Sequence, residues 1–127
     1  MTGLDTNVLL RYLVRDEPTQ AARATRELER DERFLVGSIV LCELVWVLEV
    51  GYGFPRRDIV ATIEKVLATA QFEIEDKDVA LAALDDFRQS SADFSDCLLG
   101  RRNRAAGAAE TVTFDRGLRG LEGFRLL

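Results

Sequence analysis

The 127-residue sequence predicts a single α/β domain, a three-layer α/β/α sandwich around a central, mostly parallel sheet of four to five strands. Two observations predict this architecture. Short strand-like stretches alternate along the chain with longer segments whose apolar residues recur at helical spacing. No internal repeat, low-complexity segment or long linker divides the chain, and 47% of its residues are apolar, which is enough for one core.

The first half of the chain predicts strands and helices in alternation. Pro18 and Pro55 each suit the first turn of a helix, and Ser38 is a good N-cap for the helix that begins between them. This middle helix is apolar on most of its faces, so we expect it to be well buried, and Gly51 and Gly53 end it. These elements cover residues 2–5, 6–14, 18–30, 34–37, 39–53 and 55–70.

The second half of the chain continues the alternation. The stretch QFEIE alternates as a strand does, and Asp76 caps the helix that follows it. A further helix, capped by Asp93, is closed by Gly107, and two short strands follow. These elements cover residues 71–75, 77–88, 93–107, 110–115 and 123–127.

The composition restricts the chemistry that the chain can perform. There is no histidine, which removes the commonest general base and the commonest metal ligand. A Ser-His-Asp or Cys-His mechanism is therefore impossible within this chain. The two cysteines are too few for a disulfide framework and lack the spacing of a zinc site. Any catalysis must use carboxylates, with or without a metal ion.

Charge and hydropathy exclude further classes. The net charge of −5 argues against a protein that coats DNA through lysine and arginine, but an acidic site filled by divalent cations still allows a nuclease. No stretch reaches the roughly 20 apolar residues that span a bilayer. No secretory signal is present either. We therefore expect a cytoplasmic protein that does not enter a membrane.

Four carboxylates stand where a cation site would need them. Asp5 and Asp115 each follow a predicted strand, and ligands of α/β sheets bind outside the carboxyl ends of parallel strands. Asp96 lies in the first turn of a helix, three residues after Asp93. Glu43 lies in the most apolar helix of the chain, where burial without a partner would be costly. A carboxylate cluster without histidine is the composition of a site for Mg²⁺ or Mn²⁺.

Each carboxylate also has a purely structural interpretation. Asp5 and Asp93 are suited to N-cap a helix, and Asp96 can complete a capping pattern. Asp115 can belong to a turn, and Glu43 can pair with an arginine from elsewhere in the chain. Their occurrence together favours the cation site over these separate explanations.

Four stretches in order along the chain, LDTNVLL, SIVLCELVWVL, ADFSDCLLG and TVTFDRGL, resemble the PIN domain, and above all the VapC-type toxin ribonucleases of bacterial toxin–antitoxin pairs. Each stretch alone is a weak match, but the ordered set covers essentially the whole chain. By this resemblance the catalytic and metal-binding carboxylates are Asp5, Glu43, Asp96 and Asp115. Asp93 becomes an auxiliary residue or a cap. The polar neighbours that hold ligands or waters are Thr6, Asn7, Ser38 and Thr113.

The resemblance also implies an activity and partners. One or two Mg²⁺ or Mn²⁺ ions would activate a water that cleaves RNA endonucleolytically. The chain would be the toxin of a type II, VapBC-like system, held by a VapB-like antitoxin, and would form a homodimer. Arginines around the acidic centre would contact RNA, although exposed arginines are usually solvated surface. The candidates are Arg11, Arg15, Arg101, Arg102, Arg104 and Arg116.

Other α/β classes fit less well. A phosphoryl-accepting receiver would pair its acids near the first strand and place a lysine on a late strand, and a dehalogenase-type phosphatase would carry Asp-x-Asp where this chain has Asp5-Thr6-Asn7. A Rossmann nucleotide binder would need a glycine-rich first turn. The non-enzymatic alternative is a catalytically silent PIN fold that serves as a protein-interaction module. We expect Trp46 to belong to the core and not to a base-stacking platform.

Overall fold

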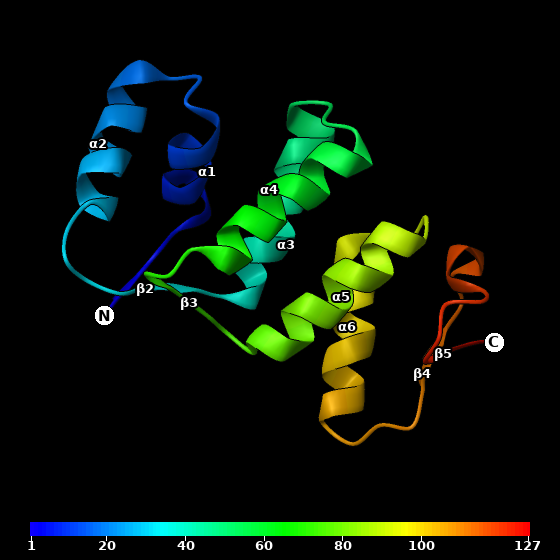
Figure 1. Ribbon diagram of the computed structural model, residues 1–127. Coiled ribbons are helices and arrows are strands. Elements are labelled where there is room, and N and C mark those ends of the chain that lie inside the picture. Colours follow the sequence, from blue (N-terminus) through cyan, green and yellow to red (C-terminus); the bar gives the residue numbers. More distant parts are fainter. The chain divides into compact units, whose positions relative to one another are not determined.

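The computed structural model describes all residues from Met1 to Leu127, which divide into two compact units (Figure 1). The first unit covers Met1–Glu75 and the second Asp76–Leu127. Each unit has its own parallel sheet and its own helices. None of the helices has the length and apolar character that crossing a membrane requires.

The first unit alternates three short strands with helices. Its elements are β1 (Thr2–Gly3), α1 (Thr6–Val14), α2 (Pro18–Leu28), β2 (Phe34–Val36), α3 (Ser38–Trp46), the π-helix η1 (Val47–Gly51), α4 (Arg56–Ala68) and β3 (Phe72–Ile74). The strands lie in the order β1-β2-β3, and both pairings are parallel. The carboxyl ends of all three strands therefore lie at one edge of the sheet. Asp5, Ser38 and Glu75 follow the strands at that edge.

The core of the first unit forms where the helices cover these strands. Alternate residues of β2 and β3 are buried, as expected for strands that pack against helices. The helices contribute fully buried side chains at helical spacing, such as Leu41, Leu44 and Leu48 along α3 and η1. Leu9 of α1 and Ile63 of α4 are fully buried as well. The hydrophobic periodicity of the sequence thus determines which faces of these helices point inward.

The second unit combines a helix pair with a two-stranded sheet. Its elements are α5 (Lys77–Gln89), α6 (Phe94–Ala105), β4 (Thr111–Thr113), the 3₁₀ turn η2 (Arg116–Leu118) and β5 (Phe124–Leu126). Phe87 of α5 and Phe94 of α6 pack edge to face, with ring centroids 5.9 Å apart. This contact fixes the first turn of α6, which carries Asp96. The strands β4 and β5 pair in parallel.

The α/β class with parallel strands is confirmed. The five strands form two sheets, of three and two strands, as the structure pairs them. Helix α1 has the predicted bounds, whereas α2 ends at Leu28 and α6 runs from Phe94 to Ala105. Gly107 follows α6 with a positive φ of 104°, so the predicted glycine stop is present.

Two expectations about α3 are wrong. Gly37, and not Ser38, is the N-cap, because the extended backbone ends at Gly37 and Ser38 is already helical. The helix is also not buried all round: Ile39 is 74% exposed and Trp46 is 64% exposed. Nine residues of helix pack against the unit along one side only, and the apolar sequence did not indicate which side. Trp46 therefore does not belong to the core.

Candidate functional site

Asp5 stands at the N-cap position of α1 without serving as a side-chain cap. Its backbone is extended, with φ −81° and ψ 153°, and its carboxylate makes no capping hydrogen bond. The preceding residue, Leu4, donates its N–H to the Leu35 carbonyl oxygen at 2.9 Å, which continues the β1–β2 ladder up to the aspartate. No hydrogen bond or ion pair engages the exposed carboxylate, so it is available to a ligand.

Glu43 is held by Thr6 and forms no ion pair with lysine or arginine. The Thr6 hydroxyl donates to Glu43 Oε1 at 2.9 Å and thereby joins the first turn of α1 to α3. Thr6 is buried, but Glu43 is exposed, which contradicts the expectation that this glutamate is surrounded by apolar side chains. The reason is its spacing from Ile39 and Trp46, four residues before and three residues after it, which places it on the uncovered face of α3.

A carboxylate that sequence reasoning missed organises the same edge of the sheet. Glu75, directly after β3, accepts a hydrogen bond from the Ser38 backbone N–H through Oε1 at 2.8 Å. It satisfies one of the free N–H groups at the start of α3 and places negative charge at the positive end of that helix. The sequence placed Glu75 at the end of a strand, where an acid at the same edge as Asp5 could have been noticed.

In the second unit, Asp96 lies among other acids. Asp93 is the N-cap residue of α6 but makes no side-chain capping bond, and Asp96 lies half-buried in the first helical turn. Burial raises the pKa of the Asp96 carboxyl, and the nearby charges of Asp93 and Asp115 raise it further. Such mutual repulsion disfavours several ionised carboxylates unless a cation is present.

Asp115 fulfils the turn role that its sequence allows. Its carboxylate accepts from the Gly117 N–H at 2.8 Å and starts η2. The Asp115 N–H in turn donates to the Thr113 hydroxyl at 3.0 Å. These bonds fix the direction in which the chain leaves β4, and they leave the second carboxylate oxygen, Oδ2, without a hydrogen bond.

The structure thus groups the predicted residues by unit. Asp5, Thr6 and Glu43 belong to the first, and Asp93, Asp96 and Asp115 to the second. No three acidic or cysteine side chains converge in a way that would by itself hold a metal ion. The donor chemistry nevertheless fits Mg²⁺ or Mn²⁺, because every predicted ligand is a carboxylate and none of the four is paired with lysine or arginine.

Two of the predicted RNA-contacting arginines are engaged within the protein. Arg101 binds Asp86 with two hydrogen bonds, Nε to Oδ2 at 2.7 Å and Nη2 to Oδ1 at 2.8 Å. Arg11 donates to Gln20, Asp16 and the Tyr52 hydroxyl. Both guanidinium groups therefore connect elements within their own unit and are not free to contact RNA with all their donors.

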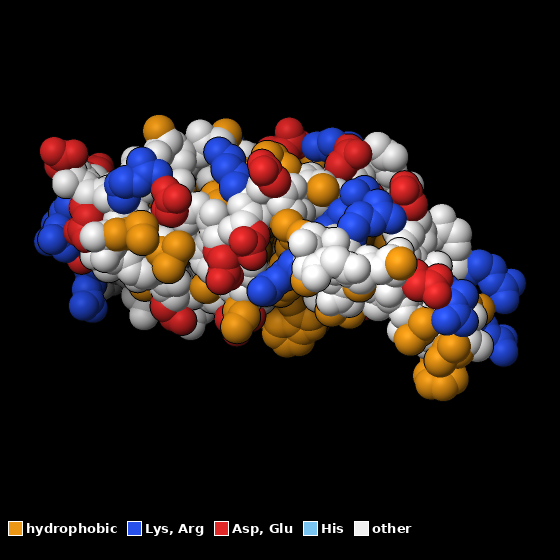
Figure 2. All heavy atoms as spheres, turned by 90° about the horizontal axis from the view of Figure 1, so that it is seen from below, with side chains coloured by type: hydrophobic (Ala, Val, Ile, Leu, Met, Phe, Trp, Pro, Cys, Tyr) orange, Lys and Arg blue, Asp and Glu red, His pale blue; other side chains and the backbone are white.

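The remaining candidate arginines are more accessible. Arg15 has left the helix, with a φ of 60°, and lies over the Tyr12 ring at 5.4 Å. Arg104 lies 3.4 Å from Glu122, whereas Arg102 and Arg116 are exposed without an ion pair. Figure 2 shows basic and acidic side chains interspersed over the face in view. A large basic surface is not visible on that face, in keeping with the net charge of −5.

Comparison with known proteins identifies the family to which the chain belongs. The PIN domain family model matches residues 4–123, which includes all four candidate carboxylates. The chain is also 33% identical over 128 aligned positions to the VapC ribonuclease of Aquifex aeolicus, an alignment that covers 98% of this chain and 94% of the relative. The motifs that carried the resemblance therefore lie within a relationship that extends over nearly the full length. The chain belongs to the PIN domain family and is a VapC-type member of it.

Proposed function

We propose that the chain is a metal-dependent endoribonuclease and the toxin component of a type II, VapBC-like toxin–antitoxin system. The observation that carries the proposal is that Asp5, Glu43, Asp96 and Asp115 all lie within the PIN-domain match and have no lysine or arginine partner. Unpaired carboxylates in a family of nucleases indicate a site prepared for a cation. The match to a protein named VapC ribonuclease supports the RNA substrate.

The proposed site uses all four carboxylates, with Asp93 as an auxiliary acid. The PIN-domain match covers residues 4–123, and all four carboxylates lie within it. A bound Mg²⁺ or Mn²⁺ ion would polarise the scissile phosphate and lower the pKa of an attacking water. Thr6 orients Glu43, and the Gly117 N–H holds the Asp115 carboxylate. The Asp115 backbone N–H donates to the Thr113 hydroxyl and fixes the turn that carries this carboxylate. No protein nucleophile is needed, in agreement with the lack of histidine.

Cleavage of RNA by the purified chain tests this proposal. We expect cleavage with Mg²⁺ or Mn²⁺ and none with EDTA. Asp5→Ala, Glu43→Ala, Asp96→Ala and Asp115→Ala should each lower the rate by at least about a hundredfold, because each removes a ligand of the same ion. Asp31→Ala removes an exposed acid outside the motifs and serves as the control, with an unchanged rate.

Two results would contradict the proposal. Equal cleavage by wild type and all variants would come from a contaminant and not from this chain. If the chain binds no metal and cleaves no RNA but does bind a protein partner, it is instead the catalytically silent interaction module.

The remaining partners are part of the same proposal. The chain would be cytoplasmic, a VapB-like antitoxin would block its acidic site, and it would act as one PIN domain and as a homodimer. The exposed apolar side chains of Ile39, Trp46 and Val50, on α3 and η1, are where such a dimer would gain most from association. Sedimentation of the purified chain distinguishes a monomer from a dimer.

A further inference from the structure

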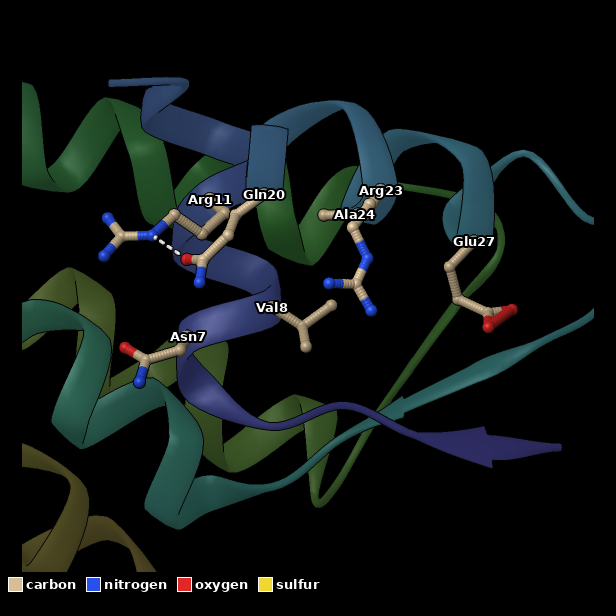
Figure 3. A pocket seen from close by; sticks show the side chains of 7 residues that line it. All are labelled: Asn7, Val8, Arg11, Gln20, Arg23, Ala24 and Glu27. Atoms are coloured by element: carbon tan, nitrogen blue, oxygen red, sulfur yellow. Dashed lines mark hydrogen bonds between the residues drawn. The ribbon is translucent and has the colours of Figure 1, made fainter. Parts of the chain in front are cut away.

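A pocket in the first unit lies between α1 and α2 (Figure 3). Its volume is about 410 Å³. The lining residues are Asn7, Val8, Arg11, Gln20, Arg23, Ala24 and Glu27. It begins in the first turn of α1, two residues after Asp5, so it adjoins the start of the proposed catalytic region. None of the sequence motifs identified its α2 wall.

The polar side of this pocket presents hydrogen-bond donors. Arg11 Nε donates to Gln20 Oε1 at 2.8 Å, which fixes the Gln20 amide with its oxygen toward Arg11. The Gln20 NH₂ group is then left with two donors that no protein acceptor satisfies. Figure 3 shows the same orientation, with the Gln20 nitrogen turned away from Arg11. Asn7 adds a second amide without a side-chain hydrogen bond.

Two arginines line the pocket, and Arg23 is the one without an acidic partner, since Arg11 is paired with Asp16. Arg23 is exposed and forms no hydrogen bond or ion pair. The one acid in the lining, Glu27, is engaged outside it, since Glu27 Oε2 accepts from Arg30 Nη1 at 2.5 Å. The pocket therefore combines the five free donors of the Arg23 guanidinium with two side-chain amides and an aliphatic wall of Val8 and Ala24. This combination matches a ligand that carries one negative charge and several acceptor oxygens.

We propose that this pocket binds a phosphodiester of the single-stranded RNA that the protein cleaves, at a linkage flanking the scissile one, with Arg23 as the main contact. The inference rests on the proposed function and adds a specific substrate subsite to it. A phosphodiester has one charge and acceptor oxygens on several sides, as the donor set requires. Arg11 acts here as a positioning residue, because it orients Gln20 while its other donors bind Asp16 and Tyr52.

The surroundings favour a nucleic acid strand over a protein carboxylate. A second hollow on the same helix is lined by Arg23, Arg26, Glu27 and Arg30, so it shares Arg23 and Glu27 with the first. Arg26 thus continues the basic residues along α2, and Arg30, which is paired with Glu27 and Glu32, lies just beyond the end of the helix. A polymer with a phosphate at every residue would use both hollows, whereas a single side-chain carboxylate would use one.

The test is binding of a fluorescein-labelled, mixed-sequence single-stranded RNA in EDTA, followed by fluorescence anisotropy at several salt concentrations. We expect Arg23→Gln to weaken binding roughly tenfold at low salt, because one charge-assisted contact is lost. The slope of log K against log salt should fall by about 0.7, the value for one phosphate on a single strand. Gln20→Glu, which replaces a donor with a negative charge, should weaken binding as well.

Arg57→Gln is the matched control. Arg57 lies in the same unit, its side chain is exposed, and it lines neither hollow, while the substitution removes the same charge. It should retain wild-type affinity within about twofold, as expected for an exposed charge away from the contact. Equal thermal midpoints for the variants establish that each is folded. Glutamine has a helix propensity close to that of arginine, so we expect them to be equal.

The outcomes separate this inference from the proposed function. If wild type cleaves RNA with Mn²⁺ but Arg23→Gln keeps wild-type affinity and salt slope, the pocket is not a phosphate subsite and the ribonuclease stands. If Arg23→Gln weakens binding but wild type never cleaves, the pocket binds RNA and the proposed activity fails. Undetectable RNA binding by wild type overturns the inference. The inference is also overturned if Arg23→Gln weakens the binding of a polyglutamate probe but not the binding of RNA, because the pocket would then bind protein carboxylates.

Discussion

At the scale of single residues, the sequence predicted the position of Asp5 better than the surroundings of Glu43. Asp5 follows a strand and precedes a helix, and that position alone predicted a carboxylate at the carboxyl edge of a sheet, where the structure has it. Whether it caps the helix could not be predicted, because a cap depends on side-chain rotation; it forms no capping bond. The exposure of Glu43 depends on which face of α3 is covered, and a helix apolar on most faces does not reveal this.

Asp96 provides a prediction about stability at this scale. Burial and the charges of Asp93 and Asp115 raise its pKa above the ordinary 3.8, so the folded protein binds this proton more tightly than the unfolded chain does. The free energy of unfolding therefore falls as pH rises through the interval between the two pKa values. Asp96→Asn removes the charge and should be more stable than wild type at pH 7 in EDTA, although we expect it not to cleave RNA.

Urea denaturation at two pH values measures this effect. The stability difference between Asp96→Asn and wild type should be present at pH 7 and should shrink below pH 3.8, where the wild-type carboxyl is protonated in both states. Added Mg²⁺ should stabilise wild type more than the variant. Asp31→Asn controls for the loss of one negative charge. An Asp96→Asn protein that is less stable than wild type at pH 7 without metal would contradict this account.

At the scale of elements, most helices and strands could be predicted, but the course of the chain after Trp46 could not. Residues 39–53 read as one helix, and the structure divides them into α3 and the π-helix η1. A π-turn inserts extra backbone where packing requires it, and no proline or glycine marks its start at Val47 in advance. The roles of arginines within elements were likewise not predictable, because an ion pair between two helices depends on how they pack.

The pairing of α5 with α6 leads to a second prediction. Arg101 and Asp86 form a two-pronged, half-buried ion pair between these helices, so Arg101→Ala should lower the free energy of unfolding by about 2 kcal/mol. Arg101→Lys should restore only part of it, because an ammonium cannot reproduce the planar double contact. Arg102→Ala, at an exposed position without an ion pair, should change stability by less than about 0.5 kcal/mol.

Equilibrium urea unfolding of the three variants provides the measurement. Arg101→Ala and Arg102→Ala with equal midpoints and equal slopes would show that the ion pair contributes nothing to folding. In that case Arg101 would return to the set of arginines available for RNA.

At the scale of the whole molecule, the alternation of strands and helices predicted parallel pairing, and the structure has it in both sheets. Which strands pair could not be predicted, because five strands of two or three residues offer little sequence on which a register could depend. The same limit applies to the carboxylates: their order along the chain is evident, but their contribution to one site depends on long-range assembly. The central claim of the proposed function is that Asp5, Glu43, Asp96 and Asp115 act together on the same metal ions.

Calorimetric titration with Mn²⁺ tests that claim most directly. The proteins to compare are wild type, Asp5→Asn from the first unit, Asp96→Asn from the second, and the double variant. For a shared site, we predict that either single substitution weakens Mn²⁺ binding at least about tenfold and that the double variant loses little more. The claim would be contradicted if the losses of Mn²⁺ affinity in the two single variants simply added in the double variant, because each carboxylate would then belong to a site of its own. A wild-type protein that binds no Mn²⁺ would contradict it as well.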